Sequence, residues 1–341
     1  MPKNLAIIAA AGSRKTETVI ERALEDPGKR TLITTYTQEN LAQIARRIEA
    51  RVRVIPSHLT VMTWFSFLIN HAIRPYQCSV LGEIDFIRGL NFKGKHGMYV
   101  QKSDPEKYFL DSNRDIYRNG VSDFACLANE NSGGSVVGRL EQLFDQIFID
   151  EVQDLVGFDL DLLDLLLKSR IAITIVGDPR QHTLSTNTSS KNKKYQGKGF
   201  LDWLKKRSDI CDCEIRSTSD RCNSRICELA SSIFPEFEPL ESIGEPVHGQ
   251  DGIHLISVAE LPAYVKAYRP TILRWNRNAN TQGLEAINIG VSKGSTYERV
   301  LIFPTKPMRN FLTDGNASKL SAPEKLYVAV TRARHSVGFV L

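Results

Sequence analysis

Two adjacent carboxylates, Asp150 and Glu151, directly follow an apolar run at residues 147–149. Such a run is typical of a buried strand in a parallel sheet, whose carboxyl end carries polar side chains to the edge where these sheets bind ligands. There the first acid can hold Mg²⁺, directly or through water, and the second can polarise an attacking water. The pair therefore suits hydrolysis of a nucleoside triphosphate. An ordinary strand end would also fit Asp-Glu alone, and a phosphate-loop sequence upstream favours the catalytic interpretation.

That candidate phosphate loop lies at residues 9–16, between a β-type run at 5–11 and a helix expected from Glu17. In such a loop, backbone N–H groups and the helix N-terminus hold the phosphates. Lys15 would neutralise the phosphates, and Thr16 would join Asp150 as a magnesium ligand. The predicted nucleotide-binding residues of the loop are Ala11, Gly12, Ser13, Arg14, Lys15 and Thr16.

Arg14 departs from the phosphate-loop motif G-x-x-x-x-G-K-[ST], which would place glycines at Ala9 and Arg14. A residue without a side chain at the second position normally lets the loop close around a phosphate. Either the Arg14 side chain points outward, or nucleotide binding is weakened. We favour the outward orientation, because the rest of the nucleotide machinery is present.

Strand-like and helix-like segments alternate along the whole chain, which predicts an α/β fold with parallel sheets. We divide the chain into one domain at 1–205, with a small, mostly helical insertion around 77–140, and a second domain at 206–341. Strands are expected at 30–36, 59–63, 171–176, 253–258, 271–273, 300–303 and 337–341, and helices at 39–52, 158–167, 226–234 and 324–333.

Polar and aromatic residues follow two of the expected strands and are candidates for nucleic-acid binding. Thr35, Tyr36 and Thr37 could contact a sugar-phosphate backbone. After the strand at 59–63, Ser66 could do the same, and for Trp64 we favour base stacking over a place in the core. The charged stretches at 102–118, 159–164 and 185–198 are interpreted as solvated faces. A nucleic-acid groove is the alternative for the basic residues of the insertion, and contact with a nucleic-acid backbone is the alternative for 185–198.

The composition is that of a soluble globular protein of 341 residues, with 42% hydrophobic and 24% charged residues. A net charge of +5 is compatible with a polyanionic partner without requiring one. No apolar run approaches transmembrane length, and the apolar start leads into the loop and not into a cleavage site. We expect a cytoplasmic protein with no membrane partner, in which all six cysteines are reduced.

Taken together, these stretches resemble the motifs of superfamily 1 DNA helicases of the UvrD/Rep/PcrA type, in the same order. Residues 9–16 resemble motif I with Arg14 aberrant, 35–38 motif Ia, 63–66 motif Ib, 150–154 the DExQD form of motif II, 177–181 motif III, 292–300 motif V and 326–334 motif VI. The resemblance implies two RecA-like P-loop NTPase domains with parallel sheets. ATP and Mg²⁺ would bind between these domains.

The resemblance also implies catalytic roles for five residues. Lys15 would bind phosphate, Glu151 would activate water, and Gln181 would report the γ-phosphate. Arg221 and Arg332 would neutralise charge in the transition state, as arginine fingers do.

The motif IV arginine has two candidates in this sequence, and motif V supplies residues for both DNA and the nucleotide. Arg216 is one candidate for the motif IV arginine, but the spacing to the following helix favours Arg221, with Asp220 in place of the usual tyrosine. From motif V, the resemblance assigns Ser292 and Lys293 to DNA and Gly294 to the nucleotide.

The implied activity is ATP-dependent translocation along single-stranded DNA, 3′ to 5′ by family habit, or short-range unwinding. The chain resembles a compact form that lacks the large 1B and 2B insertions of well-studied members. The alternative is a DNA-sensing ATPase subunit that regulates a partner nuclease and unwinds little, as in anti-phage systems such as Gabija. An inactive nucleotide-binding scaffold is a third interpretation, against which Lys15, Glu151 and Arg332 argue.

Overall fold

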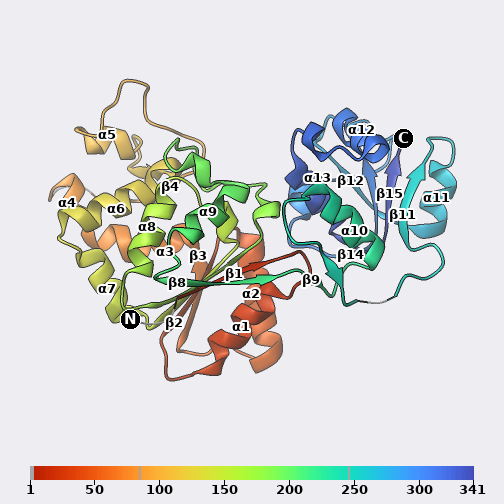
Figure 1. The fold of residues 1–341 in the computed structure, drawn as a ribbon. Helices are drawn as coiled ribbons and strands as arrows, with labels where there is room; N and C mark the ends of the chain where they lie inside the picture. Colours follow the sequence, from red (N-terminus) through yellow and green to blue (C-terminus); the bar gives the residue numbers. More distant parts are fainter. Residues whose placement is uncertain (1–3, 84–85, 245) are drawn as a thin grey trace. The chain divides into compact units, whose positions relative to one another are not determined.

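The computed structural model describes residues 4–83, 86–244 and 246–341, and contacts divide the chain into two compact units (Figure 1). Unit 1 comprises the described residues up to Ile7, Thr16–Gly177 and Ser185–Glu214. Unit 2 comprises Ile8–Lys15, Asp178–Leu184 and Ile215–Leu341. The phosphate loop and the segment of motif III thus belong to unit 2, and the boundary between the units near the middle of the chain falls between Glu214 and Ile215. The predicted domains at 1–205 and 206–341 stay a prediction.

The first sheet has six strands in the order β3-β2-β6-β7-β1-β8. The ladders that join β2 to β3, β2 to β6 and β6 to β7 are parallel. Every residue of β2 and β6 is buried, as expected of central strands covered on both faces. The strands are β1 (Asn4–Ala9), β2 (Thr31–Thr35), β3 (Leu59–Thr63), β6 (Gln146–Asp150), β7 (Ala172–Gly177) and β8 (Cys211–Arg216).

Helices cover both faces of this sheet. The connections through α1 and α2 run across the sheet toward β3, whereas α8 connects β6 to β7 in the opposite direction. Because parallel crossovers are right-handed, α8 lies on the face opposite to α1 and α2, as Figure 1 shows. The helices around this sheet are α1 (Lys15–Glu25), α2 (Gln38–Val52), α3 (Trp64–Phe67), α8 (Phe158–Leu167) and α9 (Phe200–Lys205).

The stretch predicted as a mostly helical insertion carries α4 (Cys78–Leu81), α5 (Pro105–Phe109), α6 (Val121–Asn131) and α7 (Ser135–Leu143). A short parallel ladder, β4 (Gly89–Asn91) with β5 (Asp115–Tyr117), lies between α4 and α6 in the sequence and was not expected. A π-helix, Leu68–Ile73, continues α3 toward this region.

Unit 2 is built on a second parallel sheet, in the order β11-β15-β14-β12-β13. Its core joins residues of α10 and α13 to the strands and includes Ala10 and Ala11 of the phosphate loop. The prediction of an α/β fold with parallel sheets is confirmed. The elements are β9 (Thr218–Ser219), α10 (Ser224–Ile233), β10 (Glu241–Ser242), β11 (Gly252–Ile256), α11 (Leu261–Tyr268), β12 (Thr271–Arg274), β13 (Ile287–Asn288), β14 (Tyr297–Phe303), α12 (Lys306–Asp314), α13 (Pro323–Val330) and β15 (Ala333–Val340).

The expected helix at 324–333 ends earlier than predicted. Helix α13 stops at Val330, and β15 begins at Ala333, so Thr331 and Arg332 form the turn between them. The Thr331 hydroxyl donates to the Tyr327 carbonyl at 2.8 Å and closes the last helical turn. Arg332 therefore projects from a turn and not from a helix face. Among the described residues, no helix is long and apolar enough to span a membrane.

Candidate nucleotide site

The acidic pair sits at a strained end of strand β6. Asp150 is 4% exposed, and Glu151 adopts a left-handed backbone with φ of 58°. Such a conformation costs a residue other than glycine about 1–3 kcal/mol and persists where the surrounding structure holds it in place. The Glu151 N–H donates to Asp150 Oδ1 at 2.9 Å, and the Gln153 side-chain amide donates to the Glu151 carboxylate. The pair is thus held in a defined turn, unlike an ordinary strand end.

Thr16 and Asp150 lie in contact within unit 1. The Thr16 hydroxyl donates to Asp150 Oδ2 at 3.0 Å, which brings together two of the oxygen ligands that Mg²⁺ prefers. Mg²⁺ usually takes one or two protein carboxylates and completes its shell with phosphate oxygens and water. No cluster of three or more His, Cys, Asp or Glu side chains with metal-binding geometry occurs in the described part of the chain. The Thr16 and Asp150 pair therefore fits a magnesium ion that arrives with a nucleotide.

The phosphate loop depends on Gly12. Its φ of 81° is left-handed, and a Cβ atom there would lie 2.9 Å from the Arg221 Cβ atom and collide with Ser219. Lys15 donates from Nζ to the carbonyl oxygens of Ala9 and Ala10 at 2.9 and 2.8 Å. The ammonium group is thereby folded back over its own loop, where it can exchange these carbonyls for phosphate oxygens.

Arg14 also has a left-handed backbone, with φ of 56°. Its side chain is 71% exposed, and its Nε forms an ion pair with the Asp220 carboxylate. The exposure and the ion pair agree with the outward orientation that the sequence favoured.

A buried network connects motifs III and VI. Arg332 is 2% exposed and donates from Nη2 to the Gln181 Oε1 atom at 3.0 Å. Its Nη1 donates to the Ser295 carbonyl at 3.3 Å. Gln181 in turn donates from Nε2 to Asp178 Oδ2 at 3.0 Å. The predicted phosphate sensor is therefore held between the predicted arginine finger and a buried carboxylate.

Asp178 is the centre of this network, although the sequence analysis gave it no role. Burial raises its pKa, but the charges of Arg180 and Lys15 and its hydrogen bonds outweigh burial and hold the pKa below its usual range. Arg180 Nε lies 2.8 Å from Asp178 Oδ1. The Tyr327 hydroxyl donates to Asp178 Oδ2 at 3.1 Å and accepts the Ala11 N–H at 3.3 Å. The sequence signal was available, since Asp178 directly follows strand β7, much as Asp150 stands at the end of β6.

Arg221 reaches the same turn as Arg332. It donates from Nη1 to the Thr331 carbonyl at 3.2 Å. A cavity of about 290 Å³ adjoins it and is lined also by Arg14, Asp220 and Arg334. Arg216 instead ends β8, where its carbonyl accepts the Ala10 N–H at 2.8 Å. The structure thus brings Arg221 and Arg332 together at one turn, whereas the main chain of Arg216 pairs with the strand before the loop.

Several predicted DNA contacts have structural tasks. The Thr37 hydroxyl caps α2 by accepting the Asn40 N–H, and the Tyr36 hydroxyl donates to the Ser185 carbonyl at 3.2 Å. The Ser66 hydroxyl accepts from Thr63 at 2.9 Å. The Thr35 hydroxyl is buried without a hydrogen-bond partner among the described residues. The role of these four residues in DNA binding stays a prediction.

The prediction of base stacking by Trp64 is wrong for this structure. The residue is 1% exposed, and its indole N–H donates to Asp159 Oδ1 at 2.7 Å. Neither face of the ring is open to a base, because a buried tryptophan packs its rings and pairs its N–H. The adjacent prediction of a solvated face at 159–164 is also wrong at Asp159, which is fully buried. Its carboxylate further accepts from Ser122 and Thr186.

In motif V, the structure disagrees with the predicted DNA contact of one residue, Ser292. Ser292 is fully buried, and its hydroxyl donates to the Ile289 carbonyl at 2.8 Å, so its side chain is not presented to a strand. The next residues, Lys293 and Gly294, are partly exposed, and Gly294 has φ of 87°. Their predicted contacts with DNA and nucleotide remain predictions.

The comparisons with known proteins agree on one class. A family model described as the UvrD/REP helicase N-terminal domain matches residues 107–185, which include motifs II and III. No curated protein matches the sequence. Among solved structures, arterivirus nonstructural protein 10, a helicase, matches with a TM-score of 0.50 and 14% identity, over 99% of this chain and 59% of that chain.

The same helicase in complex with DNA matches with a TM-score of 0.51 and 14% identity, over 99% and 60% of the two chains. The PRRSV helicase matches at 18% identity and a TM-score of 0.47, over 99% and 52%. The chain thus spans between half and two thirds of the length of these structures. At this identity the likeness shows the fold, with its two parallel RecA-like sheets. The family match over residues 107–185 and this likeness of fold agree with the resemblance of the motifs to compact superfamily 1 helicases of the UvrD type.

Proposed function

We propose that this protein is an ATP-dependent translocase or short-range helicase on single-stranded DNA, with 3′-to-5′ polarity. The observation that carries the proposal is the hydrogen-bonded chain from Arg332 through Gln181 and Asp178 to Tyr327 and Ala11. It joins the predicted transition-state arginine and phosphate sensor to the phosphate loop itself. A scaffold that only bound nucleotide would not need a buried arginine aligned with a sensor glutamine.

The chemistry follows from the positions of the side chains. Lys15 and the loop N–H groups would hold the β- and γ-phosphates, and Thr16 with Asp150 would hold Mg²⁺, which neutralises phosphate charge. Glu151 would accept a proton from the attacking water, because its carboxylate follows Asp150 directly at the sheet edge. Arg332 and Arg221 would stabilise the charge that develops on the transferred phosphoryl group.

Coupling of ATP hydrolysis to the bound DNA strand would begin at Gln181. Its Oε1 atom accepts from Arg332, and a γ-phosphate would compete for the same guanidinium. A change in this hydrogen bond would act on the segment 178–184 of unit 2. Two residues after this segment, the Thr186 hydroxyl donates to Asp159 in unit 1. Hydrolysis would thereby be signalled along the chain toward the region that carries motifs Ia and Ib.

A second candidate function is favoured by the ion pair between Arg14 and Asp220. This contact ties the phosphate loop to motif IV, as expected of an ATPase that a second component must release. Under this second candidate function, the protein is a DNA-sensing subunit that regulates a partner nuclease in an anti-phage complex and by itself unwinds little DNA.

The test is steady-state ATP hydrolysis with and without single-stranded DNA, for wild type and Glu151→Gln, with the exposed Glu106→Gln as the matched control. We expect strong stimulation by DNA in wild type and in Glu106→Gln and its loss in Glu151→Gln. Unwinding of a 3′-tailed but not a 5′-tailed duplex would support the helicase. Hydrolysis without unwinding, with a stable nuclease complex, would favour the second candidate. Absence of hydrolysis in wild type that Arg14→Gly restores would also favour the second candidate, whereas absence of hydrolysis in both proteins would contradict both candidates.

A further inference from the structure

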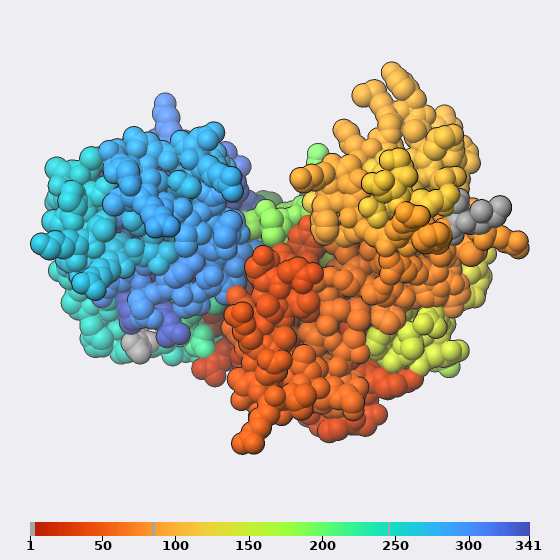
Figure 2. Space-filling view, turned by 180° about the vertical axis from the view of Figure 1, so that it is seen from behind, coloured from red at the N-terminus to blue at the C-terminus, as the bar shows by residue number. Residues whose placement is uncertain are grey.

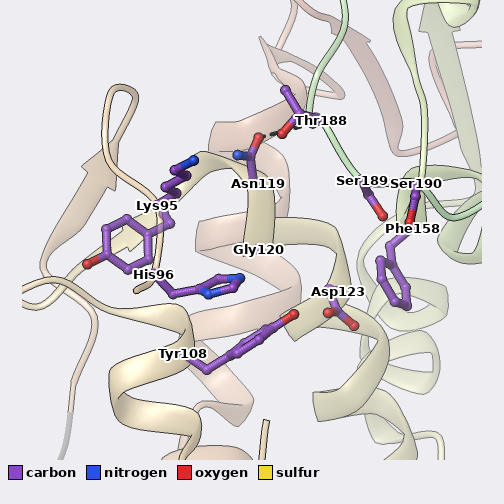
Figure 3. Close-up of a pocket in the computed structure, with 11 residues that line it drawn as sticks. Lys95, His96, Tyr108, Asn119, Gly120, Asp123, Phe158, Thr188, Ser189 and Ser190 are labelled. Atoms are coloured by element: carbon purple, nitrogen blue, oxygen red, sulfur yellow. Dashed lines mark hydrogen bonds between the residues drawn. The ribbon is translucent and has the colours of Figure 1, made fainter. Parts of the chain in front are cut away.

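A separate cavity of about 280 Å³ lies in unit 1 and contains none of the residues assigned to the nucleotide site. It is lined by the insertion on one side and by the tract at 188–190 on the other. Figure 3 shows His96 and Tyr108 on the insertion side, Phe158 with Ser189 and Ser190 across from them, and Asp123 between.

One wall of the cavity is a fixed aromatic surface. The rings of His96 and Tyr108 are stacked, with centroids 4.3 Å apart and an interplanar angle of 22°. Tyr108 also packs edge-on against the buried Phe109, with centroids 4.9 Å apart. His96 Nδ1 lies 2.9 Å from the Gly97 carbonyl, which fixes the imidazole. Such a stack can be extended by a further flat ring, and nucleobases stack on aromatic side chains in this way.

The lysines near this wall differ in whether a carboxylate neutralises their charge. Lys102 Nζ lies 2.6 Å from Asp123, and Lys107 Nζ lies 2.7 Å from Asp104, so both charges are neutralised. Across residues 4–83, 86–244 and 246–341, no carboxylate lies within ion-pair distance of Lys95 or Lys93. The Lys95 ammonium group, which lines the cavity beside the aromatic stack, provides a contact for a phosphate next to a stacked base.

The loop that carries His96 also exposes large apolar side chains. Phe92, Met98 and Tyr99 are 60%, 87% and 91% exposed. This segment, yellow-orange in Figure 2, projects from the surface of its unit. Exposed aromatic residues interleaved with lysines are typical of surfaces that hold unpaired nucleic acid, because bases stack on the rings while phosphates contact the lysines.

We propose that this cavity binds one nucleotide of a single-stranded nucleic acid, with the base extending the His96 and Tyr108 stack and a neighbouring phosphate at Lys95. The proposal rests on the proposed function for the presence of the strand, and it adds a contact outside the helicase motifs. A free mononucleotide has the same chemistry. The strand is favoured because the loop that carries Lys95 and His96 also exposes Lys93 and Tyr99, which do not line the cavity and are available to further nucleotides.

The experiment measures fluorescence anisotropy of a labelled oligothymidylate over a range of salt concentrations with the full chain. We expect His96→Ala to weaken binding roughly tenfold, the loss of about one base stack, with an unchanged salt dependence. We expect Lys95→Gln to lower the slope of log affinity against log salt by about 0.7, the value for one phosphate contact on a single strand. Lys107→Gln is the matched control, because this lysine is 74% exposed and already paired with Asp104.

Unchanged affinity and slope in both variants would overturn the proposal and leave the exposed loop to a protein partner. Saturable binding of thymidine monophosphate that His96→Ala abolishes, with oligonucleotide affinity intact, would also overturn it, in favour of a free nucleotide. Failure of the proposed function is distinguishable, because it shows as wild type without DNA-stimulated hydrolysis. The anisotropy measurement needs no ATP hydrolysis, so it tests binding at the cavity independently of the proposed ATPase activity.

Discussion

The Arg14 guanidinium and the Asp220 carboxylate form an ion pair that joins the two clearest departures of this sequence from the helicase pattern. Arg14 occupies a glycine position of the phosphate loop, and Asp220 stands where the resemblance places a tyrosine. The two residues are 206 positions apart in the sequence. Each departure is therefore explained by the other, since the arginine that replaces glycine is held outward by the aspartate that replaces tyrosine.

This relationship predicts coupled effects on ATP binding. Arg14→Gly and Asp220→Asn should each lower KM for ATP, because each frees the loop, and the double variant should gain no more than the larger single effect. The Arg14 side chain is 71% exposed and that of Asp220 is 29% exposed, so solvent screens the pair and we expect a coupling of at most about 1 kcal/mol, roughly fivefold in KM. A double-mutant cycle on steady-state kinetics measures it.

Arg53→Gly is a matched control for the relief of backbone strain, because Arg53 also has a left-handed backbone, with φ of 69° at the end of α2. It should leave KM unchanged. Additive effects of the two single variants would contradict an interaction between Arg14 and Asp220.

Arg332→Lys should lower kcat about 10²- to 10³-fold with a small change in KM. Lysine keeps the charge but cannot donate to Gln181 and to the Ser295 carbonyl from one planar group. Single-turnover and steady-state hydrolysis measure this effect. Arg334→Lys is the control, because Arg334 lies two residues away, is 51% exposed and faces Glu298. A loss of equal size in both variants would argue for general damage to the turn.

Trp64→Phe should lower the free energy of unfolding by about 2–3 kcal/mol, because it removes the indole donor to the buried Asp159 and leaves a small void. Urea denaturation measures this loss. The affinity of the folded variant for single-stranded DNA should stay within twofold of wild type. Trp275→Phe, at a half-buried position, is the control for a change of the same size. Normal stability with a large loss of DNA affinity would restore the stacking role.

Asp145 predicts a pH dependence of stability. The hydrogen bonds from Arg30 lower the pKa of Asp145 to about 2, below the value of about 3.9 for an unfolded chain. Because the folded-state pKa is the lower one, this stabilisation is fully present above about pH 4 and is lost as the pH falls toward about 2. The difference in urea midpoint between wild type and Asp145→Asn should therefore shrink over that window. A constant difference would contradict the assignment.

The sequence by itself determined much of the local structure and predicted which groups would react. The strand at 59–63 and the helix at 158–167 have the predicted bounds, because apolar periodicity and turn residues act over a few neighbours. Lys15, Thr16, Asp150 and Glu151 could be proposed as site residues for the same reason, since the motifs that predict them are defined by spacing along the chain.

Only the tertiary structure decided which polar groups face inward and which distant residues meet. Trp64 and Asp159 bury each other, and Asp178 pairs with Tyr327, although neither pair is close in sequence. Periodicity shows that a helix has an apolar face, but it does not show which polar side chain on another element will satisfy a buried N–H or O–H. That choice depends on packing between elements, which is why the ion pair of Arg14 with Asp220 could be found only in the folded chain.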